Sequence, residues 1–155
     1  MSIAAAVAMV SVCSTERSEF LEMARAHFRE LNPSFVPQDD WERCYFETIM
    51  ANPDMFARWI VVESKRIGFI LFGLEGHRFL PRRTGAIYEV YLAPGRRRHG
   101  IGRQVALQAI EEMRLHSPSK IQLEVTEGNE PASGFWRSLG FERVTERFVL
   151  PDSKP

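Results

Sequence analysis

A run of basic residues followed by glycines lies near the middle of this sequence: Arg96, Arg97, Arg98, His99, Gly100 and Gly102. The residues before it, Tyr88 to Leu92, are typical of a buried strand, and those after it are typical of an amphipathic helix. The first N–H groups of a helix have no partner within the helix, and glycines let an anion approach them. Positive side chains at a helix start are unfavourable unless an anion compensates them. The turn therefore predicts a phosphate site.

Two common phosphate-binding motifs do not match this turn. A P-loop requires Lys and then Ser or Thr after its second glycine, whereas Ile101 and Gly102 follow Gly100. A dinucleotide fingerprint requires a third glycine where Val105 stands. The composition alone leaves open an ordinary solvated charge run at a helix start.

The charge balance makes any phosphate site a local feature. Twenty Lys and Arg residues face twenty Asp and Glu residues, so the formal net charge is zero. There is no overall field to attract nucleic acid or an anionic membrane, and neither is expected as a partner. The two cysteines, Cys13 and Cys44, have neither the spacing of a metal site nor that of a disulfide framework. We therefore expect no metal and a reducing environment.

The length and the N-terminal composition predict one cytoplasmic domain. The 155 residues are 45% hydrophobic, which is enough for one core, so we expect a single domain over 1–155 with a polar tail at about 151–155. The apolar start lacks the basic region of a signal peptide and is too short to span a membrane.

The hydrophobic patterns predict an α/β chain with a mixed sheet and helices on both of its faces. The expected elements are a strand around Val7–Val12, a helix capped by Ser14 or Thr15 and ending at Asn32-Pro33, a helix with a capping box at Asp39 and Glu42, strands at 57–64, 67–75 and 85–92, a helix after Gly102, a strand at 121–125, a helix from Asn129 to Leu139 and a final strand at 141–150. A turn at Lys65-Arg66 joins two of the strands.

Two blocks of sequence carry a family resemblance. The spacing Leu92-x-Pro94 followed by Arg97-x-x-Gly100-x-Gly102 resembles the acyl-CoA pyrophosphate loop of the GNAT superfamily of N-acyltransferases. Residues 123–141 are similar to a strand and helix further along the same family. The positions of this second block that match the family are Asn129, Ala132, Phe135, Leu139, Gly140 and Phe141. The resemblance implies a mostly antiparallel mixed sheet of about six to seven strands with about four helices, whose fourth and fifth strands splay around acyl-CoA.

The same resemblance implies a set of residues for acetyl-CoA. They are Val90, Tyr91, Leu92, Arg96, Arg97, Arg98, His99, Gly100, Ile101, Gly102, Arg103, Asn129, Phe135 and Trp136. Backbone groups of Val90 and Leu92 would pair with the pantetheine arm beside a β-bulge. An N–H near Val90 or Tyr91 would face the oxyanion of the reaction, and the basic turn would hold the pyrophosphate.

The implied reaction is direct attack of a neutral amine on the thioester, with acetyl-CoA as cosubstrate. An alkyl amine has a pKa of about 10.4 and must lose a proton at neutral pH. Glu124 is the first candidate for the base and Glu89 the second, and the alternative for each is an ordinary strand carboxylate that faces solvent or a cation. Many members of the family carry a tyrosine beside the CoA sulfur, which can donate a proton to the leaving thiolate, and Trp136 stands at that position here. Tyr91 or Tyr88 is then a substitute proton donor. The alternative is that both tyrosines pack in the sheet.

The acceptor side is predicted from residue types alone. Phe35 and Trp41 are expected to form an apolar wall and Glu89 to attract a cation, which fits a small-molecule amine or a peptide N-terminus. Family members are often dimers, so the resemblance also implies a homodimer. A non-catalytic acyl-CoA-binding module on the same fold is the alternative function, because Trp136 stands where an acid is expected.

Overall fold

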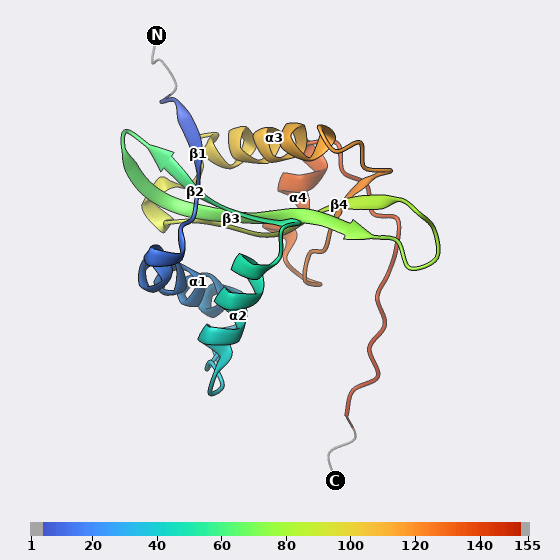
Figure 1. Cartoon of the computed structure of the whole chain (residues 1–155), viewed down its shortest axis with the longest axis horizontal. Coiled ribbons are helices and arrows are strands. Elements are labelled where there is room, and N and C mark those ends of the chain that lie inside the picture. The colour runs from blue at the N-terminus through green and yellow to red at the C-terminus, as the bar shows by residue number, and fades with distance from the viewer. Residues whose placement is uncertain (1–4, 153–155) are drawn as a thin grey trace. The chain divides into compact units, whose positions relative to one another are not determined.

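The computed structural model describes residues 5–152, which form two compact units that divide between Glu124 and Val125. The first unit contains β1 (Val7–Ser11), a 3₁₀ turn (Ser14–Glu16), α1 (Arg17–Leu31), α2 (Trp41–Ala51), β2 (Met55–Val62), β3 (Lys65–Gly76), β4 (Arg83–Leu92), a second 3₁₀ turn (Pro94–Arg96), α3 (Ile101–Arg114) and β5 (Ile121–Leu123), and the second unit contains α4 (Glu130–Ser138) (Figure 1). The end of the polar tail predicted at 151–155 lies outside the described residues.

The sheet of the first unit is mixed, as the sequence predicts. Its order is β1-β2-β3-β4-β5, with antiparallel pairing between the first four strands and parallel pairing between β4 and β5. The described residues thus form five strands, fewer than the predicted six to seven, and four α-helices, as predicted.

The final strand predicted at 141–150 is wrong. These residues are neither helix nor strand, and from Glu142 to Leu150 they are exposed. Their pattern of apolar residues suits a strand, but a strand forms only when a neighbouring strand accepts and donates its backbone hydrogen bonds. The amino-acid pattern does not supply that neighbour.

Helices cover both faces of the five-stranded sheet. α1 and α2 lie on one face and α3 lies on the opposite face (Figure 1). β3 is central, and every residue from Ile67 to Leu74 is buried, as expected for a strand that is covered on both sides. On the α1 side Phe20 packs against Trp59 and Phe69, with ring centroids 5.9 and 4.9 Å away. This packing fixes α1 against β2 and β3.

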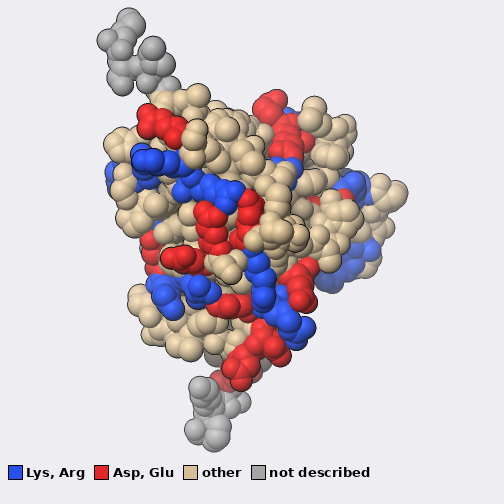
Figure 2. All heavy atoms as spheres, turned by 60° about the vertical axis from the view of Figure 1, so that its left-hand side comes forward, with Lys and Arg blue, Asp and Glu red and all other residues tan. Residues whose placement is uncertain are grey.

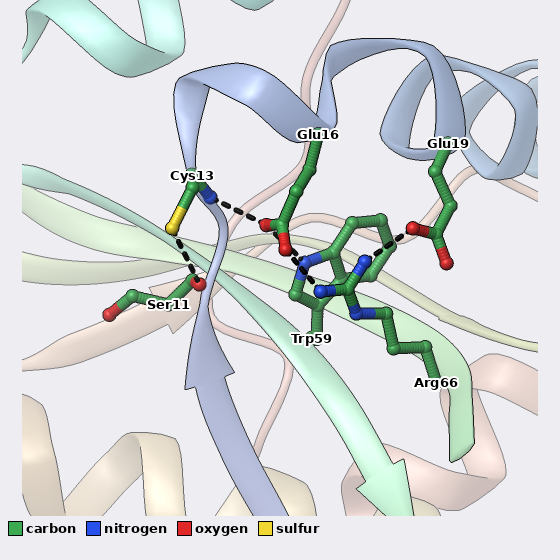
Figure 3. Close-up of polar contacts among 6 residues, drawn as sticks. All are labelled: Ser11, Cys13, Glu16, Glu19, Trp59 and Arg66. Atoms are coloured by element: carbon green, nitrogen blue, oxygen red, sulfur yellow. Dashed lines mark hydrogen bonds and ion pairs between the residues drawn. The ribbon is translucent and has the colours of Figure 1, made fainter. Parts of the chain in front are cut away.

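A charged network attaches the start of α1 to the β2–β3 hairpin (Figure 3). The carboxylate of Glu16 accepts hydrogen bonds from the N–H of Cys13 at 2.7 Å and from Nε1–H of Trp59 at 2.9 Å, and these bonds hold the pKa of Glu16 below its usual value. Arg66 binds both Glu16 and Glu19 and lies over the ring of Trp59 at 4.8 Å. The predicted cap at Ser14 or Thr15 is therefore replaced by Cys13 and Glu16.

Two predicted local features lie elsewhere in the structure. The turn between β2 and β3 is formed by Glu63 and Ser64, and not by Lys65-Arg66 as predicted. Glu63 and Ser64 have φ of 49° and 63°. A two-residue turn that follows the twist of the strands needs positive φ at both residues. The predicted capping box of α2 is also wrong. Asp40 is the N-cap with φ of 66° and makes no side-chain cap bond, and Glu42 instead forms an ion pair with Arg25 on α1.

Gly68 of β3 lies where the end of β4 passes very close. A Cβ atom on this residue would lie 1.9 Å from the carbonyl oxygen of Tyr91, whereas a Cβ on Gly76 of the same strand would meet nothing within 4 Å. We expect Gly68→Ala to lower the free energy of unfolding by roughly 1–3 kcal/mol, as overpacking does, and Gly76→Ala to change it by less than about 0.5 kcal/mol. Urea denaturation measures both. Equal stabilities of the two variants would contradict this account of β4.

Candidate functional site

The backbone of β4 changes direction at a β-bulge. The N–H of Gly85 donates to the carbonyl of Lys120 on the β5 side at 2.9 Å, whereas the N–H of Ala93 donates to Ile67 on the β3 side at 2.8 Å. These two residues are eight apart, so a regular strand would direct both amides to the same side. The extra residue is Tyr88, because Ile87 pairs with Phe72 and Glu89 with Leu71.

This bulge directs the amides of Val90 and Leu92 away from β3. These amides alternate along the strand with the amides of Tyr91 and Ala93, which face β3. Nε–H of Arg97 donates a hydrogen bond to the outward carbonyl oxygen of Leu92 at 2.8 Å. β5 pairs with β4 only from Gly85 to Ile87, so no strand of the described residues pairs with this side of β4 further along. The two strands thus part at the bulge, and polar backbone groups line the side of β4 that is left open.

The turn after β4 leads directly into the start of α3. Gly100 is the N-cap of α3 with φ of 75°, a conformation that favours glycine, and it has no side chain to cap the helix. The first hydrogen bond of the helix is donated by the N–H of Gln104 to the carbonyl oxygen of Gly100 at 3.2 Å. The amides of Ile101 and Gly102, which precede Gln104, therefore point out of the helix end. The positive end of the helix dipole and these amides together form an anion site.

The basic side chains of the turn have two different environments. Arg97 binds both carboxylate oxygens of Glu30 at 2.6 Å and the carbonyl of Leu92, so its side chain attaches the turn to α1 and β4. No acidic side chain within residues 5–152 pairs with Arg96, Arg98 or His99. On the face that Figure 2 shows, basic and acidic groups are interspersed. The local excess of positive charge at the turn is what an anion would compensate.

The two predicted base candidates both lie where β4 and β5 part. Glu124 directly follows Leu123, the last β5 residue paired with β4, and it is exposed. Glu89 lies next to the bulge, with a side chain that is 22% exposed, and accepts a hydrogen bond from Nε2–H of the buried His27 on α1. Spacing along the chain does not connect His27 with this site, because His27 and Glu89 are 62 positions apart and meet only when α1 packs on the sheet.

Tyr91 is buried on the α1 side of the sheet. Its ring lies 5.9 Å from Phe69 and 6.0 Å from His27, and Arg97 lies over it at 5.8 Å. Burial, and then the negative charge of Glu30, raise the pKa of Tyr91. This position favours packing over proton donation. Tyr88, the other candidate, donates its hydroxyl hydrogen bond to Glu75 at 2.8 Å.

The predicted apolar wall forms part of a larger aromatic cluster. Phe35 and Trp41 meet edge to face at 5.3 Å, and Trp41 stacks on Tyr45 with 5.0 Å between the ring centroids and 11° between the planes. A hollow of about 450 Å³ borders this cluster and is lined by Phe35, Val36, Gln38, Asp39, Asp40, Trp41 and Cys44. Tyr45 was missed in the sequence because its spacing within α2 reads only as a core position.

The second unit has a short helix with the predicted boundaries. The side chain of Asn129 accepts a hydrogen bond from the N–H of Ala132 at 3.3 Å and so caps α4, and Gly140, with φ of 95°, ends it. Trp136 lies 4.8 Å from Phe135 and 5.5 Å from Phe141, ring centroid to ring centroid.

Residues 20–141 match the family model described as the acetyltransferase (GNAT) family. The chain belongs to this family. The match spans the β4 bulge, the basic turn and α4, so it covers both sequence blocks that carry the resemblance.

Relatives of this GNAT chain are distant. An uncharacterized N-acetyltransferase of Methanocaldococcus jannaschii is 26% identical over 133 residues, which cover 85% of this chain but only 59% of that protein. Another uncharacterized N-acetyltransferase, from Lactobacillus delbrueckii subsp. lactis, is 26% identical over 159 residues, covering 96% of this chain and 92% of that protein. Among solved structures, the aminoglycoside N-acetyltransferase AAC(6')-Iy in complex with CoA has a TM-score of 0.73 at 13% identity, covering 99% of both chains. This likeness confirms the fold.

The site of this GNAT chain fits an acyl-CoA. The diphosphate of such a molecule suits outward amides at a helix start beside unpaired basic side chains, and its amide-containing arm suits the open side of β4. Within residues 5–152 no three His, Cys, Asp or Glu side chains group as metal ligands, and no helix there has the length and hydropathy of a membrane span.

The two environments within the turn predict different effects on stability. We expect Arg97→Ala to lower the free energy of unfolding by about 1 kcal/mol, because it loses a partly exposed ion pair and a bond to the Leu92 carbonyl. Arg98→Ala, the matched control, should change it by less than about 0.5 kcal/mol. Chemical denaturation without any ligand gives both values. A loss for Arg98→Ala as large as that for Arg97→Ala would show that the turn is held differently.

Proposed function

We propose that this protein is an N-acetyltransferase that moves an acetyl group from acetyl-CoA to a primary amine in a ternary complex. The observation that carries the proposal is the bulge at Tyr88, which directs the Val90 and Leu92 amides to the open side of β4, one short turn before an uncapped helix start at Gly100. An extended arm and a diphosphate need these two features in that order.

The proposed roles of the cosubstrate residues follow the geometry. Val90 and Leu92 would pair with the pantetheine arm, and the amides of Ile101 and Gly102 would bind the pyrophosphate together with Arg96, Arg98 and His99. Arg97 would keep the turn in position, because its side chain already binds Leu92 and Glu30. From the second unit we propose Asn129, Phe135 and Trp136, and from the first turn of α3 Arg103, as further contacts of acetyl-CoA.

The proposed reaction uses a backbone donor and a carboxylate. The amine nitrogen attacks the thioester carbonyl carbon, Val90 N–H donates to the oxyanion that forms, and the C–S bond then breaks. Glu124 would accept the proton that the amine loses, directly or through water, and Glu89 is the second candidate. The thiolate leaves without an assigned acid, because a thiol with a pKa of about 8.5 is a tolerable leaving group.

We also propose that the whole chain acts as one domain, that it forms a homodimer, and that it works in the cytoplasm. The family match supports the first of these proposals, because it runs from residue 20 to residue 141 and so covers parts of both compact units. The acceptor would be a small-molecule amine or a peptide N-terminus, bound on the side of Phe35, Trp41 and Glu89.

A negative charge at the N-cap of α3 tests the phosphate site. We expect Gly100→Glu to weaken acetyl-CoA binding by about tenfold or more, because a carboxylate there repels the pyrophosphate and the positive φ disfavours a side chain. Gly76→Glu makes the same charge change on β3 in open space and is the control. Isothermal titration calorimetry measures both affinities. If Gly100→Glu binds acetyl-CoA as well as Gly76→Glu does, the phosphate site is elsewhere.

The base is tested by removing one charge. We expect Glu124→Gln to lower kcat by roughly 10²–10⁴-fold, the usual contribution of a general base, with acetyl-CoA affinity unchanged. Steady-state thiol release across a range of pH measures the effect, and Glu127→Gln, three residues further along the chain, is a control. Full turnover by Glu124→Gln at every pH would exclude this carboxylate and leave Glu89.

A thiol-release screen of amines with acetyl-CoA tests the whole proposal. Free CoA released only in the presence of an amine is the expected result. A non-catalytic acyl-CoA-binding module, which Trp136 favours, would instead be stabilised against heat by acetyl-CoA and release none. Failure of acetyl-CoA to bind at all would exclude both functions.

A further inference from the structure

His27 of α1 is a buried imidazole with one polar partner. Its side chain is 10% exposed, and the rings of Phe28, Phe69 and Tyr91 surround it with centroids 5.3, 6.0 and 6.0 Å away. Its Nε2–H donates to Oε2 of Glu89, and no other group in the described part of the chain hydrogen-bonds to the imidazole. Among aromatic rings an imidazole has little contact with water, so this one bond fixes its tautomer and its orientation.

The carboxylate of Glu89 has one oxygen bound and the other open. The side chain is 22% exposed, and His27 holds Oε2. Oε1 has no partner among the described residues, and it is not one of their side-chain atoms that are sealed from solvent without a partner. A carboxylate that a buried donor holds at one oxygen keeps a fixed direction, and its free oxygen can accept a hydrogen bond from a ligand.

The bulge of β4 places this carboxylate beside the proposed reaction site. Glu89 follows the extra residue Tyr88 and directly precedes Val90. The amide of Val90 faces the open side of β4 and is the proposed oxyanion donor. Because Glu89 and Val90 share one peptide bond, a group that binds Oε1 is held close to the thioester carbonyl that the Val90 amide binds.

This buried contact between α1 and β4 is a costly way to join them. Taking an imidazole and a carboxylate partly out of water is unfavourable, and two apolar side chains of similar volume would hold the helix on the strand at least as well. Glu75 on β3 shows the ordinary case, because its carboxylate is exposed and accepts from the Tyr88 hydroxyl. A costly polar pair beside a reaction site indicates a role in binding or chemistry.

We propose that His27 is a positioning residue of the acceptor site, which holds the Glu89 carboxylate so that Oε1 binds the ammonium group of the acceptor. This inference rests on the proposed acetyltransferase function. An alkyl amine has a pKa of about 10.4 and therefore arrives as a cation at neutral pH. Oε1 accepts one of its three N–H groups, and Glu124 takes the proton that must leave before the nitrogen attacks. The two carboxylates thus have separate roles, Glu89 in binding and Glu124 in proton transfer.

The test separates KM from kcat. The acceptor is the amine with the highest wild-type kcat/KM in the thiol-release screen, which includes 2-phenylethylamine, glucosamine and alaninamide. We expect His27→Leu and Glu89→Gln each to raise KM for that amine about tenfold, as loss of a hydrogen bond to a charged group does, with kcat within about threefold. His27→Gln keeps a side-chain N–H donor and should stay within about threefold of the wild-type KM. Glu75→Gln removes an exposed carboxylate and is the control, with both constants within about twofold.

A double variant separates positioning from a structural role. If His27 acts only through Glu89, adding His27→Leu to Glu89→Gln changes KM by less than about twofold more. The acetyl-CoA dissociation constant, measured by calorimetry, should stay within about twofold in every variant, because the phosphate turn is untouched. A further large increase in KM in the double variant would show that His27 supports the site in another way, and the inference would be wrong.

Other outcomes would also overturn the inference. An unchanged KM in His27→Leu would do so, as would a KM in His27→Gln as high as in His27→Leu. Loss of kcat at an unchanged KM in Glu89→Gln would make Glu89 the base and not the ammonium site. If His27→Leu does not fold, His27→Gln and Glu89→Gln still decide the question. If amines release thiol while these results fail, only the roles of His27 and Glu89 are wrong, whereas the proposed function itself fails if acetyl-CoA does not bind or no amine releases thiol.

Discussion

The single extra residue in β4 is the constraint on which the rest of this site depends. β4 must pair with β3 on one side along its whole length, and with β5 on the other side over only three residue pairs. Without the bulge at Tyr88 the amides of Val90 and Leu92 would be used in the ladder with β3. With it they face the open side, and the strand still ends in register with the turn that leads to α3. One added residue thus produces both an intact sheet and a polar edge.

The bulge also decides what faces the helices. Tyr88 and Glu89 are adjacent in sequence, yet Tyr88 packs against the aromatic core while Glu89 meets His27 of α1 on the same side of the sheet. In a regular strand neighbouring residues point to opposite faces. Because of the bulge, Glu89 faces the aromatic cluster of α1 and α2 while Tyr88 still packs in the core on the same side of the sheet.

The packing of α1 against the sheet connects the two halves of the proposed chemistry. At its N-terminal end α1 is held by the network of Glu16, Trp59 and Arg66, and at its C-terminal end Glu30 holds the basic turn through Arg97. His27 and Phe28 lie between these ends and reach Glu89 and Tyr45. A shift of α1 would thus move the phosphate turn and the acceptor side together.

The sequence by itself determined the helices, the strands of the sheet core and the anion turn, because each is encoded locally. Helical spacing gave α1 and α3, β-branched and aromatic runs gave β2 and β3, and glycines after basic residues marked the start of α3. Predictions from local patterns were wrong where the structure depends on a partner elsewhere in the chain. Residues 141–150 have the pattern of a strand but form none, and Asp39 and Glu42 have the spacing of a capping box but do not cap α2. Only the tertiary structure brought His27 to Glu89 and left the Tyr45 hydroxyl without a partner, because these contacts join residues far apart in the chain. Their positions depend on how helices pack on a bulged strand, and neither spacing nor composition records that.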